Sequence, residues 1–450
     1  MSRAQRAPLR GPRIVRTPPG PKSRAAMAAK ERHVTNGIRV GLPVDIVRAN
    51  GPYVQDADGN VYVDFTTGIG VQSFGHGPSP ATRAAQNQLD ALTHISFMVA
   101  LYEPYIDLAK AMAKIAPRGL SKSIFLNSGS EAIENAVKVA RAATGRAWLI
   151  SFRTSFHGRT LLGLSLTGRH RPYRIGFGPF LREVVLCEYP YVYRDRQGRG
   201  PADVVNASLD RIEREIKAPD VGGNVAAILA EPVQGEGGII VPPKEFFPAL
   251  RKLCDTHGIV FIDDEVQAGM GRTGRVWGTE HWRTIPDLLV SGKAVGAGLP
   301  FGGVTGKPNL MDAPGPGSLG GTFGGNPVVC AAALECVGLV RTAMRQVPRL
   351  ERMIHRRLTE LQEEDPAIGD VRGLGAMWAM ELVKDPKTKE PDPDLARAIQ
   401  LEAMRRGLLV LTAGFYGNCV RLLPPLTTPP SLMETSLDLL ADAFRAVTKS

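Results

Sequence analysis

The chain has 450 residues and a mass of 48.5 kDa, which predicts several domains or one large α/β body with a smaller lobe. Its 43% hydrophobic and 22% charged residues exclude wholesale disorder, and no run approaches the roughly 18 apolar residues of a membrane helix. The net charge of +11 is concentrated in residues 1–30, which hold eight basic and no acidic residues, so neither a nucleic-acid nor a membrane partner is predicted.

In chain order, residues 52–64 predict two short strands around an Asp-Gly-Asn turn, and residues 101–115 have the apolar spacing of a helix. Strands and helices then alternate, which is typical of a mostly parallel sheet covered by helices. The expected strands are 123–126, 148–152, 225–231, 259–264, 288–291 and 302–305, and the helices are 130–143, 243–257 and 327–344. Beyond residue 344, a charged helix, a strand at 373–382, and helices at 393–406 and from 431 predict an α+β lobe.

The five cysteines are scattered, and no His-Glu-x-x-His spacing occurs. This pattern fits buried, reduced thiols in a cytoplasmic protein, and it predicts neither a disulfide framework nor a metal site.

The first motif that carries chemistry lies where an apolar strand ends in Asn-Ser-Gly-Ser and a helix begins, with Gly129 and Ser130 in its first turn. Free backbone N–H groups at a helix start, together with two hydroxyls, form an anion site. An ordinary serine cap with no ligand explains the same residues.

The second motif is an apolar strand that runs directly into Asp263, Asp264 and Glu265. Carboxylates at the carboxyl edge of a parallel sheet lie where α/β proteins place ligands, although a solvent-exposed acidic cluster is the alternative. The glycine-rich stretch 269–274 that follows lacks the Gly-Lys-Ser/Thr ending of a phosphate-binding P-loop.

The third motif is Lys293, a lone lysine between glycines and small apolar residues at the end of a strand. Removing an amine from water lowers its pKa, which an amine nucleophile requires. A solvated surface lysine is the alternative.

Together, in this order, these stretches identify the chain as similar to the class III pyridoxal-phosphate-dependent aminotransferases of fold type I, and most closely to their 4-aminobutyrate group. The resemblance covers most of the chain. The matching stretches are 127–146, 155–160, 231–238, 264–274, 291–304, 319–327, 368–377 and 420–427.

The resemblance implies that Lys293 binds the cofactor pyridoxal 5'-phosphate covalently and moves the proton on the substrate. By the same match, Asp264 rather than Asp263 pairs with the ring nitrogen. The other cofactor-binding positions that the match implies are Gly129, Ser130, Phe156, His157, Val266, Gln267 and Thr322. Thr322 would reach the phosphate of a partner subunit, which implies a homodimer, or a dimer of dimers, with shared active sites.

For the substrate, the match implies that Arg159 grips the distal carboxylate and that Arg421 receives the α-carboxylate of 2-oxoglutarate. Glu236 would pair with Arg421 when the donor has no α-carboxylate, because an unpaired buried guanidinium is costly. Ile69 would form an apolar wall of the pocket.

The expected reaction is ping-pong transamination of 4-aminobutyrate and related ω-amino acids with 2-oxoglutarate, giving succinate semialdehyde and L-glutamate. The alternatives within the family are an amino-acid racemase or epimerase and an ornithine- or acetylornithine-type aminotransferase. A third hypothesis, in which the protein is not catalytic and its basic arm binds nucleic acid or another partner, is supported only by the charge of that arm.

The expected fold is a large domain with a mostly parallel seven-stranded sheet covered by helices, plus a smaller α+β domain. The predicted domains are a flexible basic arm at 1–30, an N-terminal segment at 31–75 that packs with the small domain, a large cofactor-binding domain at 76–330, and a small domain at 331–450.

Overall fold

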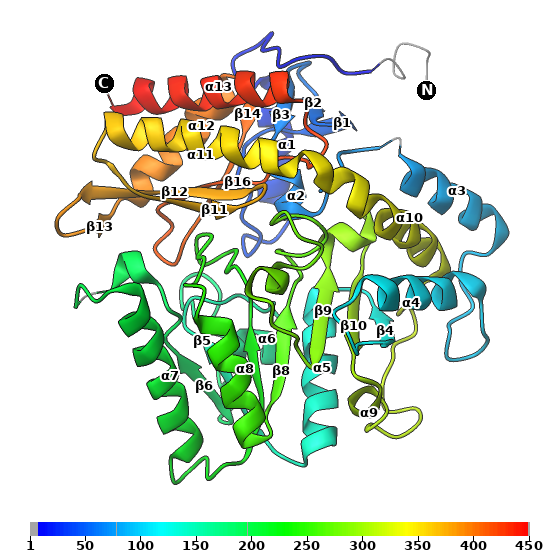
Figure 1. The fold of residues 1–450 in the computed structure, drawn as a ribbon. Coiled ribbons are helices and arrows are strands. Elements are labelled where there is room, and N and C mark those ends of the chain that lie inside the picture. Colours follow the sequence, from blue (N-terminus) through cyan, green and yellow to red (C-terminus); the bar gives the residue numbers. More distant parts are fainter. Residues whose placement is uncertain (1–7, 78, 196, 449–450) are drawn as a thin grey trace. The chain divides into compact units, whose positions relative to one another are not determined.

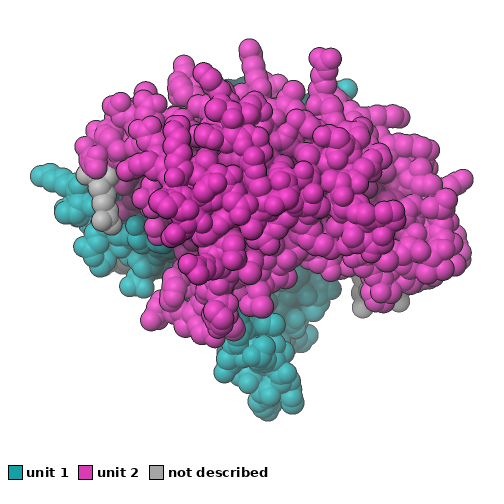
Figure 2. Space-filling view, turned by 90° about the horizontal axis from the view of Figure 1, so that it is seen from below, with its two compact units in different colours: residues 1–79, 345–450 teal, residues 80–344 magenta. Residues whose placement is uncertain are grey.

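The computed structural model describes residues 8–77, 79–195 and 197–448, so the first seven residues of the predicted basic arm lie outside the described part. The chain divides into two compact units (Figure 2). The smaller unit joins Met1–Ser79 to Arg345–Ser450, and the larger unit is the continuous segment Pro80–Met344.

The larger unit is built on a seven-stranded sheet in the order β4-β10-β9-β8-β7-β5-β6. All neighbouring strands are parallel except β10, which runs antiparallel to both β4 and β9. The strands are β4 (Lys122–Leu126), β5 (Trp148–Phe152), β6 (Val184–Cys187), β7 (Val225–Ala230), β8 (Val260–Asp264), β9 (Leu288–Gly292) and β10 (Gly302–Gly306). The predicted seven-stranded, mostly parallel sheet is therefore confirmed.

Helices flank this sheet, with α5 against β7, β9 and β10 and α8 against β8 (Figure 1). The helices of the larger unit are α3 (Pro80–Ala91), α4 (Glu103–Ile115), α5 (Gly129–Thr144), α6 (Leu161–Leu166), α7 (Pro201–Lys217), α8 (Phe246–His257), α9 (Pro308–Met311) and α10 (Pro327–Ala343). Buried apolar side chains of α5 pack against those of the strands to form the core. Because β7, β8 and β9 are parallel, their carboxyl ends meet at one edge of the sheet.

One helical stretch, residues 327–364, is long and apolar enough by length and composition alone to cross a membrane, which the sequence reasoning did not expect. It includes α10, which packs against α3 and α4 and buries side chains including Cys330, Val337 and Val340. Burial in the protein core accounts for its apolar composition, so this helix is weak evidence for a membrane span.

The smaller unit contains two sheets, with strand orders β1-β2-β3-β14 and β11-β12-β16-β15, and β13 pairs with β12. Their strands are β1 (Ile46–Asn50), β2 (Tyr53–Asp56), β3 (Val61–Asp64), β11 (Ile368–Leu374), β12 (Met377–Asp385), β13 (Glu390–Pro391), β14 (Leu408–Leu409), β15 (Leu411–Ala413) and β16 (Cys419–Leu422). The helices are α1 (Pro21–His33), α2 (Thr67–Gly70), α11 (Val347–Glu364), α12 (Pro393–Arg405) and α13 (Pro430–Thr448). Helices α11 and α12 both pack against α13 (Figure 1).

The prediction of one strand at 373–382 was wrong. The structure has a hairpin here, in which β11 and β12 pair antiparallel around Gly375 and Ala376. Gly375 has φ 60°, a left-handed conformation that glycine adopts without steric cost, and this allows the tight reversal.

Candidate active site

The carboxyl end of β8 places Asp264 beside a buried histidine. His157 Nδ1 lies 2.6 Å from Asp264 Oδ2, and the exposed fractions of the two residues are 2% and 4%. Asp264 Oδ1 accepts a hydrogen bond from the backbone N–H of Val266. One carboxylate oxygen therefore contacts the His157 ring and the other accepts from the backbone, and these two contacts together fix the orientation of the carboxylate.

The two neighbouring acids have different surroundings. Burial, together with repulsion from Glu265 and Asp264, raises the pKa of Asp263 well above its usual range. Burial also raises the pKa of Glu265 to about 7, although backbone N–H groups of Thr279 and Gly278 favour its charged form. Asp264 alone among the three has a histidine partner, which favours it over Asp263 for pairing with a cationic group.

The start of α5 lies against this cluster. Ser128 caps the helix by accepting the backbone N–H of Glu131, which leaves Gly129 and Ser130 in the first turn. A Cβ atom on Gly129 would lie 3.1 Å from Val266 Cγ1, and one on Gly158 would lie 2.2 Å from Ser130 Oγ. Close backbone approach therefore brings the helix start, Val266 and the loop after Phe156 together, as a compact anion site requires.

Lys293 is held at the end of β9, the strand next to β8. Its neighbour Gly292 also packs on Val266, since a Cβ atom there would lie 3.2 Å from Val266 Cγ1. Lys293 has φ 41°, which is uncommon for a residue other than glycine and costs roughly 1–3 kcal/mol. Such strain persists only where the surroundings impose it, and it is frequent in active sites.

Arg159 belongs to a polar and aromatic group near Phe156. Its guanidinium lies 5.0 Å from the ring centre of Tyr173, and that ring meets Phe156 edge-on at 5.1 Å. The Tyr173 hydroxyl donates to Glu236 Oε1 over 2.6 Å, and Arg169 Nη1 lies 3.4 Å from the same oxygen. The sequence reasoning missed Tyr173 and Arg169, because they lie in a loop without a motif.

The remaining predicted residues occupy other places. Thr322 is exposed on the larger unit, and the side chain of Gln267 is close to Gly235, where a Cβ atom would lie 2.4 Å from Gln267 Cδ. Ile69 and Arg421 belong to the smaller unit, where Arg421 is buried on β16 and Ile69 is 49% exposed.

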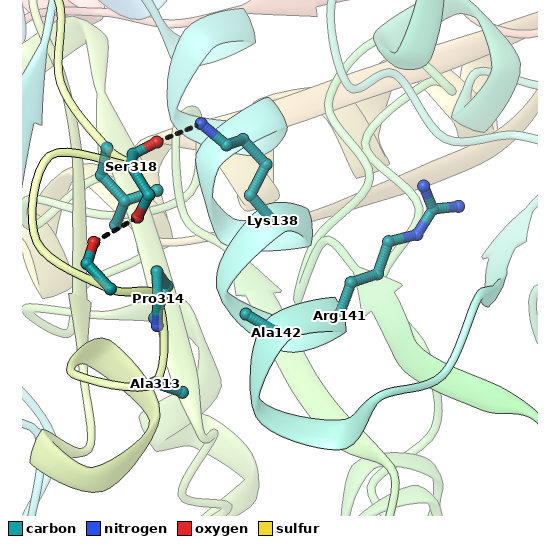
Figure 3. Close-up of a pocket in the computed structure, with 8 residues that line it drawn as sticks. Lys138, Arg141, Ala142, Ala313, Pro314 and Ser318 are labelled. Carbon is teal, nitrogen blue, oxygen red and sulfur yellow. Dashed lines mark hydrogen bonds between the residues drawn. The ribbon is translucent and has the colours of Figure 1, made fainter.

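A surface pocket lies apart from these residues, between α5 and the loop 313–319 (Figure 3). Lys138 spans it by donating to the carbonyl oxygen of Ser318 over 2.8 Å. None of the predicted site residues lines this pocket.

Residues 36–444 match the family model described as aminotransferase class-III. The chain belongs to the class-III aminotransferase family. It is 42% identical over 439 residues to a 4-aminobutyrate aminotransferase of Mycobacterium tuberculosis, covering 95% of this chain and 97% of that protein. It is also 42% identical over 422 residues to a 5-aminovalerate aminotransferase of Pseudomonas aeruginosa, covering 92% and 96%.

A solved amine transaminase from an uncultivated Pseudomonas species, in its pyridoxal-phosphate-bound form, is 32% identical with a TM-score of 0.83, covering 90% of this chain and 94% of that one. As a class-III aminotransferase, this chain is an enzyme that uses pyridoxal 5'-phosphate. Its residues fit that group: Gly129 at the start of α5 and Gly292, the residue before Lys293, both pack closely on Val266, two residues after the buried Asp264–His157 pair.

Proposed function

We propose that this aminotransferase transfers the amino group of 4-aminobutyrate to 2-oxoglutarate, giving succinate semialdehyde and L-glutamate in two half-reactions. Support comes from the 4-aminobutyrate aminotransferases that are about 40% identical over most of the chain. The observation that carries the proposal is Arg159, an exposed guanidinium beside the aromatic rings of Phe156 and Tyr173. A guanidinium binds a carboxylate through two parallel hydrogen bonds, which suits an ω-amino acid.

Bound pyridoxal phosphate supplies an electron sink for the carbon that loses a proton. In our proposal Lys293 holds the cofactor and moves that proton, while Asp264, oriented by His157, keeps the ring nitrogen protonated. Val266 and Phe156 would pack on the two faces of the ring, Gln267 would bind its phenolic oxygen, and Gly129 and Ser130 would bind the phosphate. The roles of Ile69 and Arg421 stay predictions, since both belong to the other compact unit.

We also propose a homodimer, in which Thr322 reaches the partner's cofactor. An apolar surface adjoins Thr322, and it includes Phe323, Met98, Val99 and Leu101, each more than 60% exposed. The segments around residues 94–101 and 322–326 contact each other. The rings of His94 and Phe323 are 4.9 Å apart, and Asn326 Nδ2 donates to the carbonyl of Thr93. Contiguous exposed apolar surface of this kind marks a protein interface.

A cytoplasmic location is part of the same proposal. All five cysteines are buried, and they fit a reducing compartment.

The decisive experiment separates the half-reactions. Adding 4-aminobutyrate to the purified enzyme without an oxo acid is expected to remove the visible absorbance of the bound cofactor, and 2-oxoglutarate is expected to restore it. A response only to ornithine or to an α-amino acid would overturn the substrate assignment. Loss of the optical rotation of one L-amino acid with no oxo acid present would instead identify a racemase.

5-Aminovalerate is the second candidate donor, because a 5-aminovalerate aminotransferase is as similar to this chain as the 4-aminobutyrate enzymes are. One additional methylene changes binding by only about 1–3 kcal/mol. Rates measured with each donor as a function of its concentration give kcat/KM, and the donor with the higher kcat/KM is the preferred one.

Replacing Arg159 with alanine is expected to raise KM for 4-aminobutyrate about 10- to 100-fold, because a hydrogen bond to a charged group contributes roughly 1.5–3 kcal/mol. Initial rates at saturating 2-oxoglutarate measure this effect. Arg153→Ala is the matched control, since Arg153 precedes the site by a few residues and pairs on the surface with Glu188. An unchanged KM in Arg159→Ala would contradict the assigned role.

A further inference from the structure

Glu231 is a buried carboxyl group to which the proposal above gives no role. It follows β7 directly and is 4% exposed. Its two oxygens accept hydrogen bonds from different parts of the backbone: Oε1 from the N–H of Phe156 and Oε2 from the N–H of Gly235, each over 2.9 Å. A fully buried acid whose two oxygens bind two loops fixes the distance between those loops.

The first of these loops, residues 154–159, carries Phe156, His157 and Arg159. We call it the Phe156 segment. The second, residues 234–238, carries Glu236, and we call it the Glu236 loop. They also meet directly, because Thr154 Oγ1 donates to Gln234 Oε1 over 2.5 Å.

Two further contacts link the positions of these loops to the positions of the Phe156 ring and the Glu236 carboxylate. A Cβ atom on Gly237 would lie 2.5 Å from the carbonyl oxygen of Thr154, so the two backbones touch with no room for a side chain. Tyr173 also connects the two loops, because it contacts the ring of Phe156 and donates to Glu236. A shift of either loop therefore moves both the stacking ring and the substrate-side carboxylate.

We propose that Glu231 is a positioning residue, whose ionised carboxylate holds the Phe156 segment and the Glu236 loop at the separation that cofactor and substrate require. The inference rests on the proposed function for its substrate readout alone. This role is not catalytic, because both carboxylate oxygens of Glu231 already accept hydrogen bonds from backbone N–H groups.

The charge state of Glu231 adds a pH dependence. Burial raises its pKa to about 7; the nearby His157 opposes this rise, and Asp264 adds to it. Tyr189 and Asp263 are further titratable neighbours: the Tyr189 hydroxyl donates to the Glu231 carbonyl oxygen, and Asp263 pairs in the sheet with Ala230, the residue before Glu231. A protonated carboxyl keeps only one good acceptor, so one of the two backbone N–H groups loses its partner as the pH falls below about 7.

Stability and positioning should respond to pH in opposite directions. Because the pKa is raised in the folded protein, the contribution of Glu231 to stability is fully present below its unfolded value, roughly 4.3, and is lost as the pH rises toward 7. Ionisation in the folded protein, centred near pH 7, instead improves the two backbone hydrogen bonds as the pH rises. This difference separates a positioning role from a structural one.

Glu231→Gln tests the proposal, because an amide has one acceptor oxygen and its NH₂ group would face the second backbone N–H. We expect KM for 4-aminobutyrate and the dissociation constant of pyridoxal phosphate to rise about tenfold at pH 8, since one buried donor loses its partner. The visible circular dichroism of the bound cofactor should weaken. The unmodified enzyme should bind cofactor less tightly as the pH falls from 8 to 6, and the variant should lack this dependence.

Glu188→Gln, an exposed acid that pairs with Arg153, is the control and should change none of these quantities. A lower melting temperature in Glu231→Gln, with unchanged cofactor affinity and circular dichroism, would overturn the proposal in favour of a structural role. If the unmodified enzyme does not react with 4-aminobutyrate, the substrate assignment fails, while cofactor affinity and its pH dependence still decide the role of Glu231.

Discussion

Lys293→Ala is expected to lower kcat by about 10⁴-fold or more, the largest effect of any single substitution in this chain. In the proposed mechanism, the variant would have no amine to hold the cofactor covalently and none to move the proton on the substrate. Alanine removes the side chain and leaves in place the strained backbone at position 293, just after β9, so the melting temperature without cofactor should change little. Initial rates with 4-aminobutyrate and 2-oxoglutarate measure kcat.

A second readout does not depend on turnover. After borohydride reduction, the intact mass of the unmodified enzyme should include the cofactor, and that of Lys293→Ala should not. Lys244→Ala is the control, because the side chain of Lys244 is 90% exposed, and this variant should behave as the unmodified enzyme. Activity of Lys293→Ala within tenfold of the unmodified enzyme, or cofactor retained after reduction, would refute the role of Lys293.

Asp264→Asn is expected to lower kcat about 10³-fold, the second largest effect, because a preorganised charge at the reacting group is lost while the shape remains. The amide oxygen can still accept from His157, while its NH₂ group would face the backbone N–H of Val266, so we expect a local change that leaves the fold intact. If Asp264 pairs with the ring nitrogen of the cofactor as proposed, that nitrogen would lose its proton more readily without the negative charge. Measured kcat and the absorbance of the bound cofactor as a function of pH report this change.

Asp263→Asn is the matched comparison. Burial and repulsion from Glu265 and Asp264 raise the pKa of Asp263 well above its usual range, which favours the neutral form, so an amide of the same size changes the charge less here than at Asp264. We expect less than a tenfold effect on kcat. A larger loss in Asp263→Asn than in Asp264→Asn would reverse the assignment of the two acids.

The order of strands and helices in the larger unit was predictable because buried strands and amphipathic helices leave periodic patterns. The strand at 148–152 was predicted at its observed bounds, and helix α10 was within one residue. Helix α7 was not predicted, although its buried Val204, Val205, Ser208, Ile212 and Ile216 have helical spacing, so this was an overlooked pattern rather than a missing one.

Helix α1 shows where local patterns do not suffice. Its buried surface is limited to Ser23, so no apolar stripe marks it. Its start is held instead by Asp58, which lies in the turn between β2 and β3 and accepts the backbone N–H groups of Lys22 and Ser23. A capping residue 36 positions away cannot be recognised from the sequence around the helix.

Residue order alone sufficed for the fold class, the family and the cofactor, because these depend on motifs whose residues are close in sequence and whose spacing reflects strand ends and helix starts. Three features depended on contacts between distant segments. His157 lies 107 positions from Asp264 and distinguishes it from Asp263. Tyr173 and Arg169 join Glu236 from a loop without a motif, and Glu231 binds two loops at once. Hydrogen bonds of this kind form only after the sheet has brought the loops together, so their partners cannot be inferred from spacing along the chain.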